Sequence, residues 1–440
     1  MRRGVAGGWT ARGAPASSGD MADIDTDILI VGGGLTGLSA ALALEQAGFA
    51  VCVVDREAPA TIVDPAFDGR ASAIAYASWR MLGALGVAER IGEVQPIEEI
   101  LVSDGRPGDR QRSGAASMLT LHFDHRELGE GASPLGWMIE NRRMRVALAD
   151  AVRARIADGG PIDWRAPAVV TDLAVDGPNA AATLADGTVI RARLALGCDG
   201  RSSQVRRTMG VRAYGWSYGQ TGIVATAVFE APHGGVAHEY FLPNGPFAIL
   251  PLTGNRASLV WTEKTAGAKA LMSLDEAAFG AELQRRFGRH LGQVRIEGPR
   301  WSYPLSLDLA AEWTRPRMAL VGDAAHGIHP IAGQGLNLGL KDVAALAQVL
   351  AEAAALGEDI GSTLVLERYA RWRRFDTMTL AAACDGFVRL FSTDAAPVRT
   401  LRTLGLGIVD ALAPARKLFM RHAGGDAGDL PLLLRGERLA

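Results

Sequence analysis

The sequence lacks the features that mark a membrane-spanning, disulfide-bonded or nucleic-acid-binding protein. It has no run of about eighteen uncharged apolar residues, so no transmembrane helix is predicted. Its cysteines, Cys52, Cys198 and Cys384, are far apart without CxxC or metal spacing, which suits a reducing compartment. The formal net charge of −2 gives no overall attraction for nucleic acid. With 440 residues, 48% of them hydrophobic and 21% charged, the chain is predicted to form a two-domain globular protein.

The N-terminal residues before the first apolar run carry arginines but no acid before Asp20. They show no clear amphipathic period and no apolar core. We interpret residues 1–22 as a disordered extension, with a transit peptide as the alternative, and exclude them from fold reasoning.

The most informative stretch is residues 322–339, GDAAHGIHPIAGQGLNLG. Residues 318–321 before it predict a buried strand, and the Ala/Leu-rich pattern over residues 336–356 predicts a long helix. Glycines between them let backbone N–H groups approach a flat ligand, and the helix start favours negative charge. This suits an isoalloxazine ring, which becomes negative at its N1/C2 oxygen edge when reduced, while Asp323 can accept from a ribityl or ribose hydroxyl. A strand-to-helix turn without a ligand is the alternative.

A second glycine-rich turn lies near the N-terminus, within a strand–helix–strand pattern over residues 27–54. In this turn Gly32 permits the bend, Gly34 lets a pyrophosphate reach the backbone, and Gly37 permits close packing of helix on strand. Asp55 ends the second strand, where an acid accepts from the adenosine ribose hydroxyls. The pattern predicts one dinucleotide-binding unit. Because there is no second fingerprint, a nicotinamide donor would have to bind transiently.

The stretch at 322–339, with its form GDAAHxIHPxAGQGxNLGLxD, resembles the second FAD-binding motif of the aromatic hydroxylases related to p-hydroxybenzoate hydroxylase. More narrowly, it is similar to the form in the ubiquinone-biosynthesis hydroxylases, and the resemblance spans about residues 24–425. It implies an α/β fold: a Rossmann-like FAD-binding domain interleaved with an antiparallel-sheet substrate domain, followed by a C-terminal helical segment.

Segments in which apolar and polar residues alternate indicate where the domain boundaries lie. The FAD-binding domain is expected over residues 23–96, 137–213 and 310–390, the substrate domain over 97–136 and 214–309, and the C-terminal segment over 391–440. The apolar strands at 247–252 and 259–261 either wall an aromatic pocket or belong to the plain core.

The resemblance also implies a set of FAD-contacting residues. Arg70, in a DxRxxA pattern, would clamp the pyrophosphate, although by itself it reads as a solvated arginine. Asn141 or Arg142 would face the ribityl chain; alone they read as a helix cap and a surface charge. Asp199 would lie near the diphosphate, which requires bridging N–H groups or Arg206. The full cofactor set is Gly32, Gly34, Leu35, Thr36, Gly37, Asp55, Arg56, Arg70, Asn141, Arg142, Asp199, Gly200, Gly322, Asp323, Gly333, Gly335 and Asn337.

For catalysis, the resemblance implies that reduced FAD reacts with O2 to form a C4a-hydroperoxide that attacks an electron-rich ring carbon in a dry cavity. Pro330 would border the peroxide, and the N–H groups of Gly335, Leu336 and Asn337 would stabilise the anionic flavin. His326 is interpreted as structural and His329 as reaching flavin or substrate. Both lie in one loop without a third ligand, so no metal site is predicted. No residue is assigned to deprotonate a phenol.

The leading hypothesis is an FAD-dependent monooxygenase that hydroxylates a polyprenylated phenol or benzoquinol in ubiquinone biosynthesis. The alternatives are a hydroxylase of a small soluble aromatic acid and a catalytically silent flavoprotein scaffold. The ring carbon, the electron donor (NADH, NADPH or a ferredoxin) and the oligomeric state stay open. Apolar and basic residues over 394–422 predict a segment that docks on a membrane or a biosynthetic complex, or a helix packed on the FAD domain. The expected location is cytoplasmic, with peripheral attachment to the inner face of the membrane as an extension.

Overall fold

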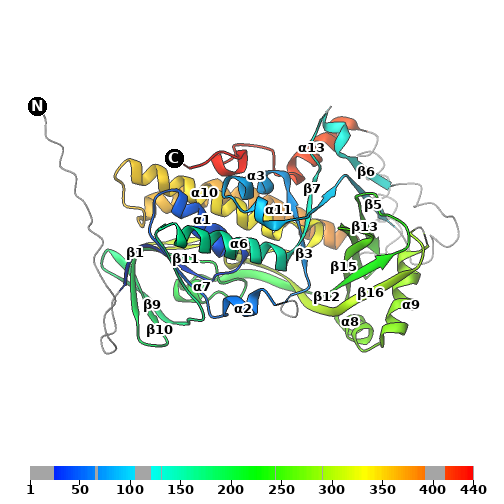
Figure 1. Ribbon diagram of the computed structural model, residues 1–440, viewed down its shortest axis with the longest axis horizontal. Helices are drawn as coiled ribbons and strands as arrows, with labels where there is room; N and C mark the ends of the chain where they lie inside the picture. Colours follow the sequence, from blue (N-terminus) through cyan, green and yellow to red (C-terminus); the bar gives the residue numbers. More distant parts are fainter. Residues whose placement is uncertain are drawn as a thin grey trace, which may run out of the picture.

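The computed structural model of the chain describes residues 24–64, 68–104, 120–129, 131–242, 244–289, 291–391 and 412–439. Two large sheets lie side by side along the longest axis, with a layer of helices over the first (Figure 1). The expected N-terminal extension, residues 1–22, lies outside the described residues.

The first sheet has the strand order β17-β18-β11-β1-β2-β8, and β10 and β9 continue from β11. Its core is parallel, because β1 pairs with β2 and β11, β11 pairs with β18, and β2 pairs with β8, all in parallel. The strands are β1 (Ile24–Val31), β2 (Val51–Val54), β8 (Ile162–Arg165), β9 (Val170–Asp176), β10 (Asn179–Leu184), β11 (Val189–Gly197), β17 (Thr314–Arg315) and β18 (Met318–Leu320).

Helices cover this sheet and bury its apolar strands in one continuous core (Figure 1). The chain forms helices here because small and aliphatic residues recur on one side; in α10, for example, Leu338, Leu346 and Leu350 are buried. The helices are α1 (Leu35–Gln46), α2 (Pro59–Ile62), α3 (Tyr76–Ala84), α4 (Ala88–Ile91), α6 (Asn141–Ala157), α7 (Gln204–Thr208), α10 (Gly335–Ala355) and α11 (Thr363–Phe391).

The second sheet has the order β19-β16-β12-β15-β14-β13-β5-β6 and is antiparallel except where β13 pairs with β5. Its outer face is covered by α8 (Thr265–Met272) and α9 (Glu276–Phe287) (Figure 1). The strands are β5 (Glu99–Asp104), β6 (Thr120–Asp124), β12 (Ala213–Phe229), β13 (Val236–Leu242), β14 (Gly245–Leu252), β15 (Arg256–Lys264), β16 (Val294–Ala310) and β19 (His326–Gly327). A small sheet of β3 (Ala71–Ala75), β7 (Gly136–Glu140) and β4 (Gln95–Ile97) accompanies the two large ones.

α1 begins at Leu35, directly after Gly34, so the helix of the predicted strand–helix–strand unit starts within the glycine-rich turn. No helix was predicted where α8 lies. The chain end was expected as a helical segment, and α13 (Ala413–Ala423) is indeed helical. However, the 3-10 turn η4 (Leu432–Arg435) returns to the first core, where Leu433 is 0% and Leu434 1% exposed.

Among the helices of the described ranges, none combines the length and the apolar content needed to cross a bilayer.

Candidate functional site

Four parallel strands of the first sheet end in one row. The pairing registers place Val54, Val31, Gly197 and Leu320 side by side across β2, β1, β11 and β18. Each strand runs directly into a predicted motif: Asp55, the turn at 32–37, the turn at 198–200 and the loop at 322–333. In open parallel sheets, ligands bind at the carboxyl ends of the strands. The three glycine motifs, far apart in sequence, therefore meet at one edge.

Close backbone approach explains several glycines at this edge. A Cβ built at Gly37 would lie 1.8 Å from the carbonyl oxygen of Gly32, and one at Gly32 would lie 2.5 Å from the carbonyl oxygen of Cys198. Gly322 has φ +63, and its Cβ would lie 3.2 Å from a side-chain carbon of Thr36. The first motif thus touches both others through glycines, where an added side chain would crowd the neighbouring motif.

Two other glycines, Gly34 and Gly335, face open space instead of a neighbouring backbone. Gly34 is exposed, and a Cβ at Gly34 or at Gly335 would meet no atom within 4 Å. Gly335 begins the 21-residue α10, whose first turn receives no side-chain cap hydrogen bond from Gln334. The first N–H groups of a helix have no intrahelical acceptor and favour an anion. The open space beside Gly34 can take a phosphate, and the uncapped start of α10 beside Gly335 can face a reduced flavin ring. The residues present therefore fit FAD.

The two predicted carboxylates, Asp55 and Asp199, both lie at the row of strand ends. Asp55 accepts from the N–H of Gly33 and, at 2.7 Å, from that of Glu57, whereas Arg56 beside it is exposed. One oxygen of Asp199 caps α7 by accepting from the N–H of Gln204 at 2.6 Å; the other is buried without a partner among the described residues.

Arg206 does not pair with Asp199, which corrects one of the two expected bridges. Its guanidinium donates instead to the carbonyl oxygens of Ala324, at 2.8 Å, and Arg201, at 2.6 Å. The negative charge of Asp199 is therefore balanced by the N–H groups of α7, and Arg206 holds the loop after β18. Gly200, with φ +77, completes the turn.

A buried carboxylate that the sequence did not single out organises the Arg70 region. Asp68, 5% exposed, bonds to Arg70 at 2.9 Å and to Arg145 at 2.5 Å. Burial alone would raise the pKa of Asp68, but the two guanidinium groups outweigh burial and hold that pKa well below its usual value. Asn141 is buried and its side-chain oxygen accepts from Ser72 at 2.6 Å. Arg70 keeps an exposed side, available for a pyrophosphate.

Arg142, the neighbour of Asn141, is exposed and donates to the carbonyl oxygen of Val63 at 2.7 Å. The contact ties the start of α6 to the chain after α2. A role toward the ribityl chain stays a prediction.

His326 is structural, as its predicted role required. Its Nε2 lies 2.5 Å from an oxygen of Asp342, which also accepts from the N–H of Gly322 at 3.1 Å. The other oxygen of Asp342 accepts from Arg373 at 3.0 Å. Asp342 and His326 are both 0% exposed. This cluster fixes the loop start against α10 and α11.

His329 has a different environment. It is 1% exposed, its Nδ1 accepts from the N–H of Ile331 at 3.2 Å, and its Nε2 has no partner among the described residues. The ring of Tyr218 packs edge-on against it at 5.1 Å. Burial, together with the charge of Arg201, lowers the pKa of His329 to about 4. At neutral pH the ring is therefore uncharged, and its low pKa makes it too weak a base to take the proton of a phenol.

The remaining loop residues are split between exposed and anchored positions. Pro330 is exposed and Gly333 and Leu336 are half-buried, so this side of the loop is accessible. Asn337 is buried: its side chain accepts from the N–H of Ala75 at 2.9 Å and donates to the carbonyl of Ala73 at 2.8 Å. The asparagine side chain thus ties α10 to β3, and only its backbone N–H is a candidate for the flavin.

Sequence reasoning missed Arg201. Its guanidinium donates to the carbonyl oxygens of Ser306, at 3.0 Å, and Ile328, at 2.6 Å, and lies 3.6 Å from Asp323. Arg201 therefore links the first sheet to β16 and to the loop that carries Pro330. Its place directly after Asp199-Gly200 was the available signal.

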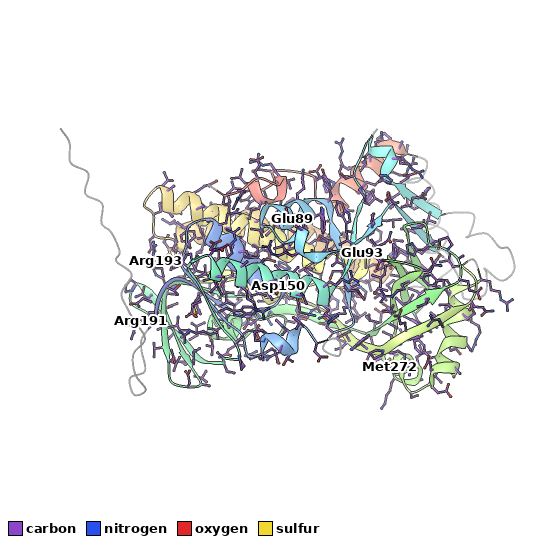
Figure 2. All side chains as sticks on the ribbon, in the orientation of Figure 1. Glu89, Glu93, Asp150, Arg191, Arg193 and Met272 are labelled. Carbon is purple, nitrogen blue, oxygen red and sulfur yellow. The ribbon has the colours of Figure 1, made fainter. Side chains whose placement is uncertain are left out.

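Part of the apolar strands at 247–252 and 259–261 belongs to the hydrophobic core of the second sheet. Phe247 and Trp261 are 0% and 1% exposed and pack beneath α9 with Phe279. A hollow of about 400 Å³ lies on that same outer side, lined by residues that include Met272 and Arg300. Met272 lies at the edge of the molecule away from the first sheet (Figure 2). This hollow is not the FAD site.

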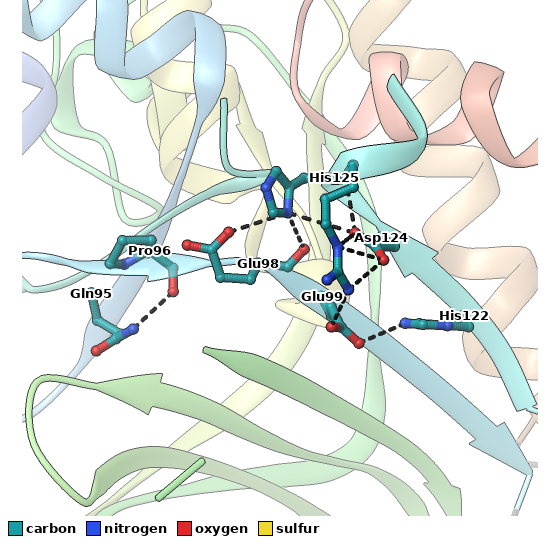
Figure 3. Close-up of polar contacts among 8 residues, drawn as sticks. Gln95, Pro96, Glu98, Glu99, His122, Asp124 and His125 are labelled. Atoms are coloured by element: carbon teal, nitrogen blue, oxygen red, sulfur yellow. Dashed lines mark hydrogen bonds and ion pairs between the residues drawn. The ribbon is translucent and has the colours of Figure 1, made fainter. Parts of the chain in front are cut away.

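One group in the described part of the chain has metal-like spacing: Glu99, His122 and Asp124, whose ligand atoms lie within 4.8 Å of one another. Figure 3 shows the carboxylate of Glu99 in contact with His122. Arg126 lies 2.9 Å from Glu99 and 2.6 Å from Asp124. The guanidinium already pairs with both carboxylates, so each of them has a cationic partner within the protein.

Comparisons with known proteins agree with this geometry. A family model described as an FAD binding domain matches residues 25–375. The chain is 46% identical over 436 residues to ubiquinone hydroxylase UbiL of Rhodospirillum rubrum, covering 98% of each protein. It is 36% identical over 406 residues to 3-demethoxyubiquinol 3-hydroxylase of Escherichia coli, covering 92% of this chain and all (100%) of that one. Human ubiquinone biosynthesis monooxygenase COQ6 is 31% identical over 458 residues, covering 92% and 94%.

Among solved structures, p-nitrophenol 4-monooxygenase PnpA from Pseudomonas putida matches with a TM-score of 0.75 at 20% identity, covering 93% of this chain and 100% of that one. At this identity the match establishes the fold alone.

Proposed function

The chain belongs to the FAD-binding monooxygenase family that contains the ubiquinone-biosynthesis hydroxylases, and from this we propose that it hydroxylates the ring of a polyprenylated phenol or benzoquinol on the route to ubiquinone. It is an FAD-dependent monooxygenase. The observation that carries the substrate class is the full-length similarity, at 46% and 36% identity, to two hydroxylases whose names specify ubiquinone or its precursor.

Bound FAD supplies the oxygen chemistry: once reduced by NAD(P)H or another donor, it passes electrons to O2 and delivers one oxygen atom to the substrate. The chain's own residues bind and orient it. We assign Asp55 to the ribose, Asp323 to the ribityl chain, and the first N–H groups of α10 to the negative charge of the reduced ring.

His329 is proposed as a hydrogen-bond donor at this site. Because Nδ1 accepts from Ile331, the single proton of the neutral ring lies on Nε2. A buried N–H without a partner costs about 1–3 kcal/mol, which an oxygen of the substrate or flavin would recover. The apolar cluster around it, including Ile328, Ile331 and Leu307, excludes water from the loop.

The role assigned to Pro330 predicts that this residue affects how much of the activated oxygen ends up in hydroxylated product. Pro330→Ala is expected to retain FAD but to form several-fold less hydroxylated product per electron pair consumed, because the exposed proline borders the open side of the loop. The measurement compares hydrogen peroxide released with product formed from a prenylphenol bearing two isoprene units. Unchanged coupling in this variant would show that the proline does not shape the reaction.

The same assay separates the alternatives. A hydroxylase of small aromatic acids would convert hydroxybenzoates in preference to the prenylphenol, and a silent scaffold would bind FAD yet oxidise donor slowly with either compound. Turnover of the prenylphenol alone supports the proposed substrate class.

We further propose that α13 touches a membrane surface or a membrane-bound assembly. Leu412, Leu418 and Phe419 are 52%, 58% and 47% exposed, and Lys417 and Arg421 lie among them. Arg416, in contrast, pairs with Glu127 at 2.9 Å and holds α13 on η1 (His125–Leu128). Apolar residues beside cations fit an anionic lipid surface. The rest of the expected docking segment, residues 394–411, lies outside the described residues.

Vesicle flotation tests this surface. Leu418→Ser/Phe419→Ser is expected to float several-fold less than the parent with vesicles containing anionic lipid at low salt, because apolar area and charge both contribute to binding. Leu356→Ser, at an apolar residue 74% exposed at the other end of the helical layer, is the matched control and should float normally. Equal flotation of the double variant would exclude α13 as the contact. Substitution is preferable to truncation, because η4 belongs to the core.

A further inference from the structure

Glu239 lies in the middle of the second sheet, on β13 between β14 and β5, opposite Ala248 and Val102. Side chains alternate between the faces of a strand, so Glu239 shares its face with Ala237 and Phe241. The next residue, Tyr240, belongs to the core beneath α8 and α9. Glu239 therefore points away from those helices.

The pairing registers show what this face meets. Directly opposed residues share a face, and the row from Glu239 runs through Ala248, Val260 and Val224 to Trp301. A Cβ built at Gly69 would lie 1.9 Å from the Trp301 ring. Since Gly69 stands between Asp68 and Arg70, this face of the sheet is turned toward the FAD-binding motifs.

The two neighbours of Glu239 on that face belong to buried clusters that border the FAD loop. Phe241 shares a cluster with Ile328 and Ile331, which flank His329 and Pro330. Ala237 shares a cluster against which Ala73 packs. The carbonyl of Ala73 accepts from Asn337 at the start of α10. Glu239 thus lies between the two places where the second sheet approaches this loop.

The carboxyl itself has no assigned partner. No hydrogen bond or ion pair to Glu239 occurs among the residues that the structure describes. The residue is half-buried, and burial alone raises the pKa of its carboxyl to about 8. Burying a carboxyl without a cation nearby costs stability. Such groups are common at sites that bind or transform a ligand, and this one keeps some accessible surface.

We propose that the Glu239 carboxylate accepts a hydrogen bond from a ring hydroxyl of the phenolic substrate and takes its proton as the ring is hydroxylated. The phenol O–H bond breaks, a carboxyl O–H bond forms, and the electron pair stays on the ring oxygen, from which it feeds the ring carbon that bonds to the incoming oxygen atom. The raised pKa narrows the gap to a phenol of pKa about 10, so proton transfer is less unfavourable than to an ordinary carboxylate. A carboxyl with a pKa of about 8 is mostly ionised only above that pH, so both tests below are carried out at about pH 9. This inference rests on the proposed function.

The first test is binding, without turnover. The probe is the two-unit prenylphenol and its O-methyl ether, titrated into the oxidised, FAD-loaded enzyme without reductant and followed by the flavin absorbance. The unaltered enzyme should prefer the phenol by about tenfold, since a hydrogen bond to a charged group contributes about 1.5–3 kcal/mol. Glu239→Leu should lose that preference. An unaltered enzyme that binds both probes equally would overturn the proposal.

The second test is turnover of the prenylphenol. Glu239→Gln retains an oxygen that accepts the hydroxyl but cannot take its proton, so Kd should change little while kcat falls by about 10²–10³-fold, as for loss of a general base. The matched control is Glu297→Gln, a strand glutamate of the same sheet that pairs with Arg256 at 2.9 Å and whose side chain is 47% exposed. It should retain kcat.

The outcomes also separate this inference from the proposed function. If the unaltered enzyme hydroxylates the prenylphenol and Glu239→Gln does so at the same rate, the role of Glu239 is wrong and the function stands. If the unaltered enzyme binds neither probe, the substrate class is wrong, and the inference falls with it. FAD content and melting temperature, measured for every variant, identify loss of fold.

Discussion

Gly34→Val is expected to weaken FAD binding by about 100-fold or more, a loss of about 2.7 kcal/mol, and to leave the fold intact. Gly34 precedes α1 with φ −74 and ψ −168, a conformation that valine adopts readily. Its added side chain would meet no protein atom, because a Cβ there has none within 4 Å. It would instead occupy the space through which a pyrophosphate approaches the backbone.

The measurement is fluorescence titration of apoprotein with FAD, combined with thermal unfolding of the apoprotein. Gly83→Val is the matched control: Gly83 is exposed on α3, its Cβ would also meet no atom within 4 Å, and FAD affinity should be unchanged. Gly37→Ala should differ from both by losing the fold, since its Cβ would lie 1.8 Å from the Gly32 carbonyl oxygen. Full FAD occupancy in Gly34→Val would show that no pyrophosphate binds at this turn.

The nucleotide-binding edge could be predicted from sequence because its signals are local. Each strand of the row is a short apolar run, and the residue type needed at its end follows directly, as Asp55 follows β2 and Gly32 follows β1. The parallel sheet then brings these ends together, so three local patterns are enough to place the site. The roles of individual residues within it stay predictions.

Residues whose environment is created by distant segments could not be predicted in this way. Arg145 reads as a surface charge on a helix, yet it is 7% exposed because Asp68, 77 positions away, lies against it. Arg206 follows the DG motif as a partner for Asp199 should, but the loop after β18 offers it a carbonyl oxygen instead. In both cases the sequence shows a charge and the tertiary packing selects its partner.

Glu239 illustrates a failure of the alternation rule. A glutamate in a strand normally marks the solvent face of a sheet. Here both faces are covered, one by α8 and α9 and the other by the side that holds the FAD motifs, so the polar position is enclosed. Its neighbours Ala237 and Phe241 on the same face are apolar, and this was the available signal.

The end of the chain shows a similar limit. The run Leu432–Arg435 is too short for a periodic signal, yet Leu433 and Leu434 complete the core against α3 and α10. A pattern of three leucines after a proline does not indicate which surface they cover, because the partner residues are far earlier in the sequence.

Asp342→Ala is expected to lower the free energy of unfolding by about 3–5 kcal/mol, because it leaves a buried cation without its counter-charge. Arg373 is 5% exposed and Asp342 is 0% exposed, so water cannot replace the lost carboxylate. The same change frees the N–H of Gly322, which begins the FAD loop, so FAD release should accompany the loss. Asp376→Ala is the matched control: Asp376 also pairs with Arg373, at 2.9 Å, but its side chain is 46% exposed, and removal should cost about 1 kcal/mol or less.

The pH dependence of this effect has a definite sign. Burial alone would raise the pKa of Asp342, but His326, Arg373 and the Gly322 N–H outweigh burial and hold that pKa below its usual value. A depressed carboxyl pKa contributes stability that is fully present above the unfolded-state pKa of about 3.9 and is lost as the pH falls through the lower folded-state value. Urea unfolding of the FAD-loaded proteins at pH 7 should therefore show the full difference between parent and Asp342→Ala, and the difference should shrink only below about pH 4. Equal urea midpoints at pH 7 would mean that Arg373 finds another partner and that the loop does not depend on Asp342.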